Sequence, residues 1–364
     1  MQNSKENYHV IGLMSGTSVD GLDIAYCRFT STDKWKFEIL HAQTADYPDA
    51  LRKKLKSCYA LSAEDLTALD HELGTWIGHQ VKGFISKNSL KPDLIASHGH
   101  TVFHQPHRKF TLQIGNLFDI YREGGIPVVG DFRSLDVALG GQGAPLVPFG
   151  DLMLFSEYDF CLNLGGFANI SFDDKHERVA YDICPANIVL NHLSGKKGLE
   201  FDESGKLASV GSLVDELFQK LNNQDYYGQK GPKSLGVEWV NQNIIPVLEN
   251  DPSSIENKLT TFCHHIGYQI SQSIKSASAK QNGELLVTGG GAFNEFLVGT
   301  IQQYLGEEIA CIVPESNIIS FKEALVFAYL GLMRYQNKIN TLKSVTGASQ
   351  NSSGGVIVNN SLIF

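Results

Sequence analysis

The residues with the clearest capacity for chemistry lie close to the start of the chain, in the stretch Ser15–Asp23, which reads SGTSVDGLD. This stretch joins two apolar runs, Tyr8–Leu13 and Leu22–Phe29, which the sequence predicts to be strands. Successive backbone N–H groups in a tight glycine turn form a concave nest of donors suited to anionic oxygens. Hydroxyl groups add further donors here, on Ser15, Thr17 and Ser18.

The acids of this stretch indicate which anion would fit. Asp20 and Asp23 would repel a bare phosphate, but they suit a phosphate that arrives with Mg²⁺. The alternative is a plain hairpin closed by Asx and Ser turns. From this stretch alone both interpretations stay open.

Two further glycine turns favour the phosphate interpretation. Gly165-Gly166 follows the apolar run Phe160–Leu164, and Gly289-Gly290-Gly291 follows Glu284–Thr288 and precedes a helical pattern. A strand, a glycine turn and a helix in that order are typical of nucleotide sites, because glycine lets the backbone approach the ligand. Neither the dinucleotide pattern GxGxxG nor the Walker pattern GxxxxGK[ST] is present.

The elements that must position these turns follow one pattern twice. Each half opens with three successive strands, of which the first two are joined by a glycine turn, and then becomes helical. Two similar α/β lobes with a ligand cleft between them would explain this restart. The loop Gly140–Pro148 separates the halves. We predict strands at 8–13, 22–29, 36–44, 93–97, 111–114, 126–129, 160–164, 168–172, 179–182, 284–288, 308–313 and 356–358, and helices at 48–59, 62–86, 116–123, 186–192, 212–221, 237–249, 253–279, 294–304 and 321–334.

Composition excludes several classes of protein. Of the 364 residues, 42% are hydrophobic and 19% are charged, so a large core can form. The net charge of −9 argues against a nucleic-acid binder, which normally carries a basic patch. No apolar run reaches the length of a membrane span. The six cysteines are scattered without a CxxC pair, which fits a reducing, cytoplasmic compartment.

A set of motifs in fixed order resembles one family, the anhydro-N-acetylmuramic acid kinases. Each motif is short, but together they cover almost the whole chain. They are Ser15–Asp23, Ser97–Pro106, Leu112–Asn116, Asp131–Arg133, Gly140–Pro148, Asn163–Ile170, Asp182 with Pro185–Asn187, Gly289–Asn294, Lys322–Ala324 and Ser344–Ala348.

The resemblance implies a fold and a reaction. The fold is α/β, with two RNase H-like lobes of the actin and hexokinase type around a nucleotide cleft. Residues 1–132 with 335–364 would form the N-terminal lobe, and residues 133–334 the C-terminal lobe. The reaction joins 1,6-anhydro-N-acetylmuramic acid, ATP and water to give N-acetylmuramic acid 6-phosphate and ADP, a step of peptidoglycan recycling. It implies Mg²⁺, a cytoplasmic location and a homodimer, with no nucleic-acid or membrane partner.

The resemblance also implies residue roles. Asp182 would be the catalytic base, Asp20 and Glu323 would lie near Mg²⁺, and His98, Thr101, Asp131 and Arg133 would contact the sugar. The ATP-binding set would be Gly16, Thr17, Ser18, Asp20, Gly21, Asp23, Gly165, Gly166, Gly289, Gly290 and Gly291.

Structural alternatives remain for several of these residues. Asp182 could cap the next helix, Asp131 and Arg133 could form an ion pair, and Glu323 could be a surface residue. The histidines at 98, 100, 104 and 107 have no Cys or carboxylate among them, so a zinc site is disfavoured.

The chain departs from the family pattern at two places, and these bear on the substrate. His100 stands where glutamine is usual, and Ile183-Cys184 stands where threonine and glycine are usual. Larger side chains there are expected to narrow the pocket beside the base. Another anhydrosugar such as levoglucosan therefore stays open as the substrate. Two other functions also stay open, namely an actin- or Hsp70-type ATPase without a sugar substrate and a dinucleotide oxidoreductase using Gly289–Gly291.

Overall fold

The chain folds into two compact units. The computed structural model describes residues 6–229, 231, 233–277 and 282–360. Unit 1 is Met1–Leu154 with Phe321–Phe364, and unit 2 is Phe155–Ser320. The sequence predicted the divisions at 132/133 and 334/335, whereas the units divide at 154/155 and 320/321.

Two helices explain the position of these divisions. Helix α5 (Val147–Leu154) falls in a region that the sequence predicted partly as loop, and it packs on helix α12 (Ser316–Tyr335). A Cβ added at Gly150 of α5 would lie 2.5 Å from Val326 Cγ2 of α12. A buried ion pair between Lys322 Nζ and Asp151 Oδ1, 2.8 Å long, joins the same two helices. Most of α12 therefore stays with α5 in unit 1.

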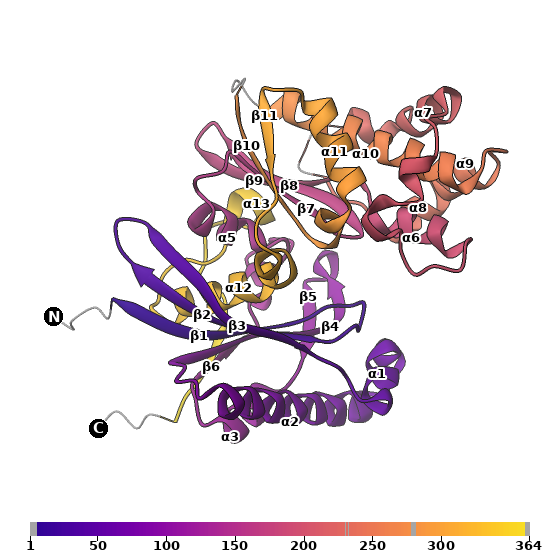
Figure 1. The fold of residues 1–364 in the computed structure, drawn as a ribbon. Helices are drawn as coiled ribbons and strands as arrows, with labels where there is room; N and C mark the ends of the chain where they lie inside the picture. The colour runs from indigo at the N-terminus through magenta and orange to yellow at the C-terminus, as the bar shows by residue number, and fades with distance from the viewer. Residues whose placement is uncertain (1–5, 230, 232, 278–281, 361–364) are drawn as a thin grey trace. The chain divides into compact units, whose positions relative to one another are not determined.

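The sheet of unit 1 has the order β12-β6-β4-β1-β2-β3, with β5 paired to β4 (Figure 1). Strand β2 is antiparallel to both of its neighbours, β1 and β3, whereas β4 is parallel to β1 and β6 is parallel to β4. These strands are β1 (Asn7–Ser15), β2 (Leu22–Ser31), β3 (Trp35–Ala45), β4 (Leu94–Gln105), β5 (Phe110–Ile114), β6 (Val128–Gly130) and β12 (Val356–Val358).

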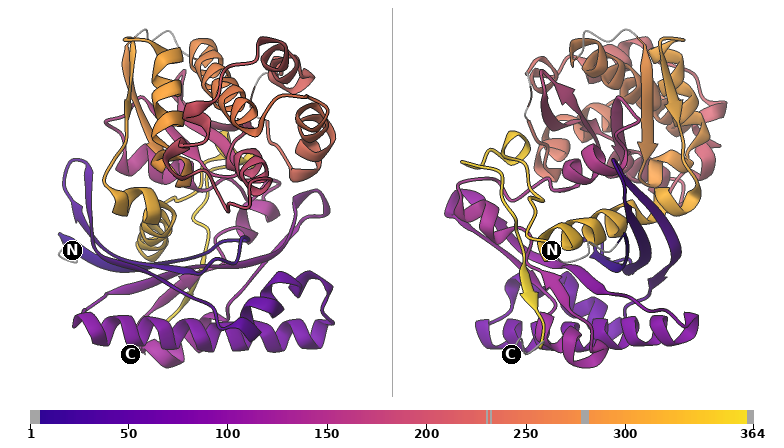
Figure 2. Two further views of the ribbon diagram at one scale, coloured as in Figure 1. Left: turned by 45° about the vertical axis from the view of Figure 1, so that its right-hand side comes forward. Right: turned by 90° about the vertical axis from the view of Figure 1, so that its left-hand side faces the viewer.

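Helices cover both faces of this sheet (Figure 2). One face carries α2, which starts where Ser62 accepts a hydrogen bond from the Asp65 amide, as its capping pattern predicts. The other face carries α12, which lies so close that a Cβ at Gly12 of β1 would be 1.9 Å from the Ala324 carbonyl oxygen. The remaining helices of unit 1, beside α2 (Ala63–Asn88), are α1 (Asp49–Lys56), α3 (Leu117–Gly124), α4 (Ser134–Ala138) and α13 (Lys343–Thr346).

Unit 2 repeats the same strand topology. Its sheet has the order β11-β10-β7-β8-β9, with an antiparallel meander β7-β8-β9, β10 parallel to β7, and β11 parallel to β10. Apart from the extra strands β5 and β12 of unit 1, both units have the RNase H-like order, so the predicted fold class is confirmed. The strands are β7 (Phe160–Leu164), β8 (Phe167–Asp174), β9 (Glu177–Pro185), β10 (Gly283–Thr288) and β11 (Ile309–Ile312).

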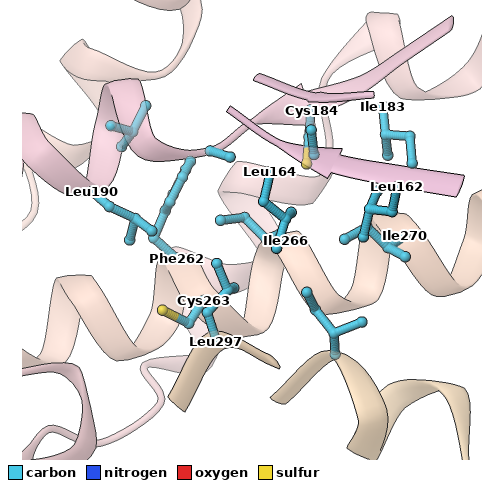
Figure 3. Packing of buried hydrophobic residues seen from close by; sticks show 14 of the residues in the cluster. Leu162, Leu164, Ile183, Cys184, Leu190, Phe262, Cys263, Ile266, Ile270 and Leu297 are labelled. Atoms are coloured by element: carbon cyan, nitrogen blue, oxygen red, sulfur yellow. The ribbon is translucent and has the colours of Figure 1, made fainter. Parts of the chain in front are cut away.

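A hydrophobic core joins this sheet to its helices. Figure 3 shows Ile266 and Ile270 of α10 packed toward Leu164 and Leu162 of β7. The predicted helix 237–249 is two helices, because a new one begins at Ile245 with Pro246 in its first turn. Residues 278–279 of the predicted helix 253–279 lie outside the described residues. The helices are α6 (Asn187–Gly195), α7 (Asp215–Asn222), α8 (Val237–Asn243), α9 (Ile245–Glu249), α10 (Ile255–Ala277) and α11 (Glu295–Leu305).

Candidate active site

The β1–β2 loop of unit 1 has the geometry of a tight turn under strain. The Val19 amide donates to the Gly16 carbonyl at 3.2 Å, and Val19 has a φ of 59°, a conformation that a β-branched residue rarely adopts. Thr17, Ser18 and Asp20 are exposed, whereas Val19 is buried. The buried Val19 side chain fixes the turn, so the loop presents its small polar residues outward.

Ser15 does not take part in the way the sequence predicted. Its Oγ is buried, accepts a hydrogen bond from Tyr47 Oη at 2.7 Å, and lies 2.9 Å from His100 Nδ1. The hydroxyl is therefore committed to this internal network at the base of the loop. His100, which departs from the family pattern, is a structural partner of Ser15.

Acids of the loop and of α12 interact electrostatically within unit 1. Burial raises the pKa of Asp23, the Thr44 hydroxyl at 2.6 Å lowers it, and the charge of Asp20 raises it. Glu323 is an exposed residue, but desolvation of its carboxyl group by the surrounding protein atoms raises the pKa of that group. The charge of Arg133 lowers this pKa, and the charge of Asp23 raises it. Asp20, Asp23, Glu323 and Arg133 therefore belong to one electrostatic cluster.

Arg133 is anchored by His98. Arg133 Nε and Nη2 lie 3.0 and 2.8 Å from His98 Nε2, and Arg133 Nη1 donates to the Gly143 carbonyl at 2.7 Å. His98 Nδ1 lies 2.9 Å from the Gly99 carbonyl oxygen, which can only accept, so Nδ1 carries the proton and Nε2 is the acceptor. Burial and the charge of Arg133 hold the pKa of His98 well below its ordinary value.

This anchoring leaves part of the guanidinium available. Burial lowers the pKa of Arg133 to about 10, with Glu323 acting in the opposite direction, so the group stays charged at neutral pH. Of its five N–H groups, one on each Nη has no partner among the described residues. Such a pair of donors fits a carboxylate end-on. The alternative ion pair with Asp131 is not formed in the described part of the chain, since Asp131 accepts from Ser134 Oγ.

Two of the predicted sugar residues line a pocket of about 190 Å³ in unit 1. His98 and Asp131 contribute to it, and Asp131 adopts the left-handed conformation with a φ of 54°. Ser97 Oγ and Gln113 Oε1 also belong to its lining residues and are buried without a hydrogen-bond partner in the described structure. Phe118 stands at the pocket and is 69% exposed. Thr101 lies outside the lining and accepts a long hydrogen bond of 3.4 Å from Gln113 Nε2.

The glycine turns of unit 2 come together. The Ala186 and Asn187 amides donate to the carbonyls of Gly166 and Gly165 at 2.8 and 3.1 Å. A Cβ at Gly291 would lie 2.6 Å from Leu164 Cβ, and one at Gly289 would lie 2.6 Å from Asn163 Oδ1. The β7–β8 turn and residues Gly289, Gly290 and Gly291 thus form one glycine-lined site at the ends of β7 and β10.

Asp182 lies on the edge strand β9 of unit 2. Its Oδ2 accepts from the Leu235 amide at 2.9 Å, and Oδ1 has no hydrogen-bond partner among the described residues. Burial raises the pKa of this carboxyl, and the Leu235 hydrogen bond lowers it. The sequence offered no signal for Leu235, because a backbone donor leaves no mark on residue type.

The neighbours of Asp182 do not behave as the sequence predicted. Ile183 is 3% exposed and Cys184 0%, and both belong to the hydrophobic core of unit 2 (Figure 3). They therefore fill the core and do not narrow a pocket beside Asp182. A strand exposes alternate residues, but the pairing of Asn169 with Asp182 and of Ala168 with Cys184 leaves Ile183 as an extra, bulged residue.

The described residues, 6–229, 231, 233–277 and 282–360, contain no group of three or more His, Cys, Asp or Glu side chains that could hold a metal ion. None of the helices described is long and apolar enough to cross a membrane.

Comparison with known proteins decides the family. The family model for anhydro-N-acetylmuramic acid kinase matches residues 8–360. The chain belongs to the anhydro-N-acetylmuramic acid kinase family. An anhydro-N-acetylmuramic acid kinase from Francisella tularensis subsp. novicida is 32% identical, over 94% of this chain and 96% of its own length, and one from Aliivibrio fischeri is 34% identical, over 95% and 98%. The predicted family is thereby confirmed.

Solved structures resemble the chain more distantly. One is a ROK-family glucokinase from Streptomyces griseus in complex with glucose and AMPPNP, with a TM-score of 0.41 and 12% identity over 89% of this chain and 99% of the other.

Proposed function

We propose that the protein is an ATP-dependent kinase that opens the 1,6-anhydro ring of 1,6-anhydro-N-acetylmuramic acid and phosphorylates O6. The products are N-acetylmuramic acid 6-phosphate and ADP. Membership of the anhydro-N-acetylmuramic acid kinase family is the observation that carries this proposal. It disfavours levoglucosan, a sugar-free ATPase and a dinucleotide oxidoreductase. We place the reaction in the cytoplasm, in peptidoglycan recycling, and carried out by a homodimer.

Asp182 is the proposed general base. Oδ1 would accept a proton from the water that attacks the anomeric carbon, while the C1–O6 bond breaks and O6 attacks the γ-phosphorus of ATP. A general base contributes about 10²–10⁴ in rate. The free Oδ1 and the raised pKa of Asp182 both suit this task.

We assign nucleotide contacts within each unit separately. In unit 1 they are the backbone of Gly16 and Gly21 and the side chains of Thr17 and Ser18; in unit 2 they are Gly165, Gly166, Gly289, Gly290 and Gly291. Mg²⁺ needs one or two carboxylates besides phosphate oxygens. The mutual repulsion of Asp20 and Asp23 fits a bound cation, and Asp20 with Glu323 are the residues we assign to hold it, directly or through water. When bound, the cation neutralises the charge that develops on the phosphoryl group.

We assign the acceptor sugar to His98, Thr101, Asp131 and Arg133 of unit 1. One N–H group on each Nη of Arg133 has no partner among the described residues, and this pair of donors suits the carboxylate of the sugar's lactyl group. The pocket beside Asp131 suits hydroxyl and acetamido groups, because Ser97 Oγ and Gln113 Oε1 lack partners there and Phe118 offers an aromatic face.

A phosphorylation assay tests the proposal. We expect ADP release to depend on 1,6-anhydro-N-acetylmuramic acid, with levoglucosan at least tenfold poorer in kcat/KM because it lacks the groups that Arg133 and the pocket recognise. Asp182→Asn should abolish turnover while ATP binding stays within about tenfold, since the substitution removes the base and keeps the shape. Full activity of Asp182→Asn, or ADP release independent of sugar, would overturn the assignment.

A further inference from the structure

Asp182 is held by residues outside every motif on which the proposed function depends. The Asp182 N–H donates to the Lys233 carbonyl at 3.0 Å, and the Tyr226 hydroxyl donates to the Asp182 carbonyl at 2.6 Å. The Leu235 N–H donates to Asp182 Oδ2 at 2.9 Å. We call Tyr226, Lys233 and Leu235 the Asp182 clamp.

The position of Asp182 explains why a clamp is needed. β9 is the last strand of its sheet, and it carries a bulge at Ile183 directly after Asp182. A bulge at a sheet edge leaves backbone groups without ladder partners and re-aims the side chain beside it. The clamp supplies the partners of both the N–H and the C=O of Asp182, so its backbone is fixed where the sheet alone would leave it loose.

Lys233 and Tyr226 also hold each other. Lys233 Nζ donates to the Tyr226 carbonyl at 3.0 Å and lies 4.3 Å from the centre of the Tyr226 ring. Tyr226 is 5% exposed, and its ring packs 5.4 Å from that of Trp239. The three residues Asp182, Lys233 and Tyr226 therefore close a ring of hydrogen bonds that is anchored in the core of unit 2.

We propose that the Asp182 clamp is the positioning device of the water-activating carboxylate, with Leu235 fixing Oδ2 and Tyr226 and Lys233 fixing the backbone, so that Oδ1 faces the reacting water. This inference rests on the proposed function of Asp182. Tyr226, Lys233 and Leu235 are positioning residues, because they reach the reaction through Asp182.

The first test compares two adjacent tyrosines. Tyr226→Phe removes the hydroxyl that holds the Asp182 carbonyl, whereas Tyr227→Phe removes one that lies 3.0 Å from His265 Nε2, away from Asp182. We expect Tyr226→Phe to lower kcat on the order of tenfold with the KM for ATP unchanged. Tyr227→Phe should stay within about twofold. Equal kcat values for the two variants would overturn the role of Tyr226.

The second test separates the Leu235 amide from its side chain. Leu235→Pro removes the N–H, and Leu235→Ala keeps it. Because that N–H favours the charged carboxylate, its loss should raise the pKa of Asp182. The acid limb of the plot of kcat against pH should then move to higher pH by about one unit. The limb of Leu235→Ala should stay in place. A limb that does not move in Leu235→Pro, while its melting temperature stays close to that of Leu235→Ala, would overturn the role of Leu235.

A measurement without turnover keeps the two proposals apart. In ¹³C-carboxyl-labelled protein, the Asp182 signal is the one that disappears in Asp182→Asn. Its titration should shift to higher pH in Leu235→Pro but not in Leu235→Ala. If wild-type protein does not phosphorylate the anhydrosugar yet this shift occurs, the proposed function fails, the catalytic role of the clamp fails with it, and only the hydrogen bond from Leu235 to Asp182 is confirmed. If wild-type protein is active and the shift is absent, the clamp fails alone.

Discussion

The neutral imidazole of His98 offers a sharp test of the sugar site that we propose in unit 1. His98 Nε2 is the acceptor for two N–H groups of Arg133, at 3.0 and 2.8 Å. His98→Leu deletes that acceptor, whereas His98→Gln can replace Nε2 with an amide oxygen at a similar reach. The pair of variants therefore separates the hydrogen bond from the volume of the ring.

The expected magnitude follows from the charge and burial of the partner. A hydrogen bond to a charged group contributes about 1.5–3 kcal/mol, which corresponds to about 10- to 150-fold in an equilibrium constant. In the proposed site, loss of His98 would also leave Arg133 without its orientation toward the carboxylate of the sugar. We expect His98→Leu to raise the KM for 1,6-anhydro-N-acetylmuramic acid by this factor, and His98→Gln to recover most of the loss.

Initial rates of ADP release at saturating ATP measure this effect, and the KM for ATP at saturating sugar serves as the internal control. Melting temperatures of both variants establish that each is folded at the assay temperature. A KM for sugar in His98→Leu equal to that of wild type would refute the reasoning, and so would an equal rise in His98→Gln and His98→Leu.

Two further predictions concern stability. Burial lowers the pKa of His265 to about 3, so below the unfolded-state pKa of ~6.5 protons bind the unfolded chain preferentially. The free energy of unfolding should therefore fall by about 2 kcal/mol between pH 7 and pH 5. Urea denaturation should show that His265→Gln removes this fall. Breaking the buried Lys322–Asp151 pair by Asp151→Ala should cost about 3–5 kcal/mol. The matched change Glu72→Ala, in the exposed Lys54–Glu72 pair, should cost under about 1 kcal/mol, and similar losses for the two would contradict the role of burial.

The sequence predicted the strands of both units well because their signal is local. Alternation and glycine turns located β1, β2 and β7, and the Ser62 capping pattern located the start of α2. The division into units could not be read locally, since it depends on α12 packing against α5 and on Gly12 admitting α12 to β1. Those are contacts between residues far apart in the chain.

The site shows the same contrast. The resemblance to the kinase family indicated Asp182 and Arg133, and residue type indicated the glycine turns, because glycine lets the backbone approach a ligand. The role of Ser15 depends on its burial, because its buried hydroxyl bonds to Tyr47 and His100. The roles of Ile183 and Cys184 also depend on burial, because both side chains lie in the hydrophobic core. No residue type reveals whether a side chain points to the core or to the solvent when a bulge shifts the alternation of its strand.

The bulge at Ile183 also explains why the Asp182 carboxylate is not buried in the core beside Cys184. In a regular strand the residues on either side of Ile183 would share one face, so a buried Cys184 would imply an Asp182 in the same core. The extra residue breaks this alternation, so Cys184 enters the core at 0% exposure while Asp182 stays half-buried with Oδ1 available. We infer that this irregularity keeps Asp182 available for its proposed role as general base, and the hydrogen bonds of Tyr226, Lys233 and Leu235 hold the irregular strand at that position.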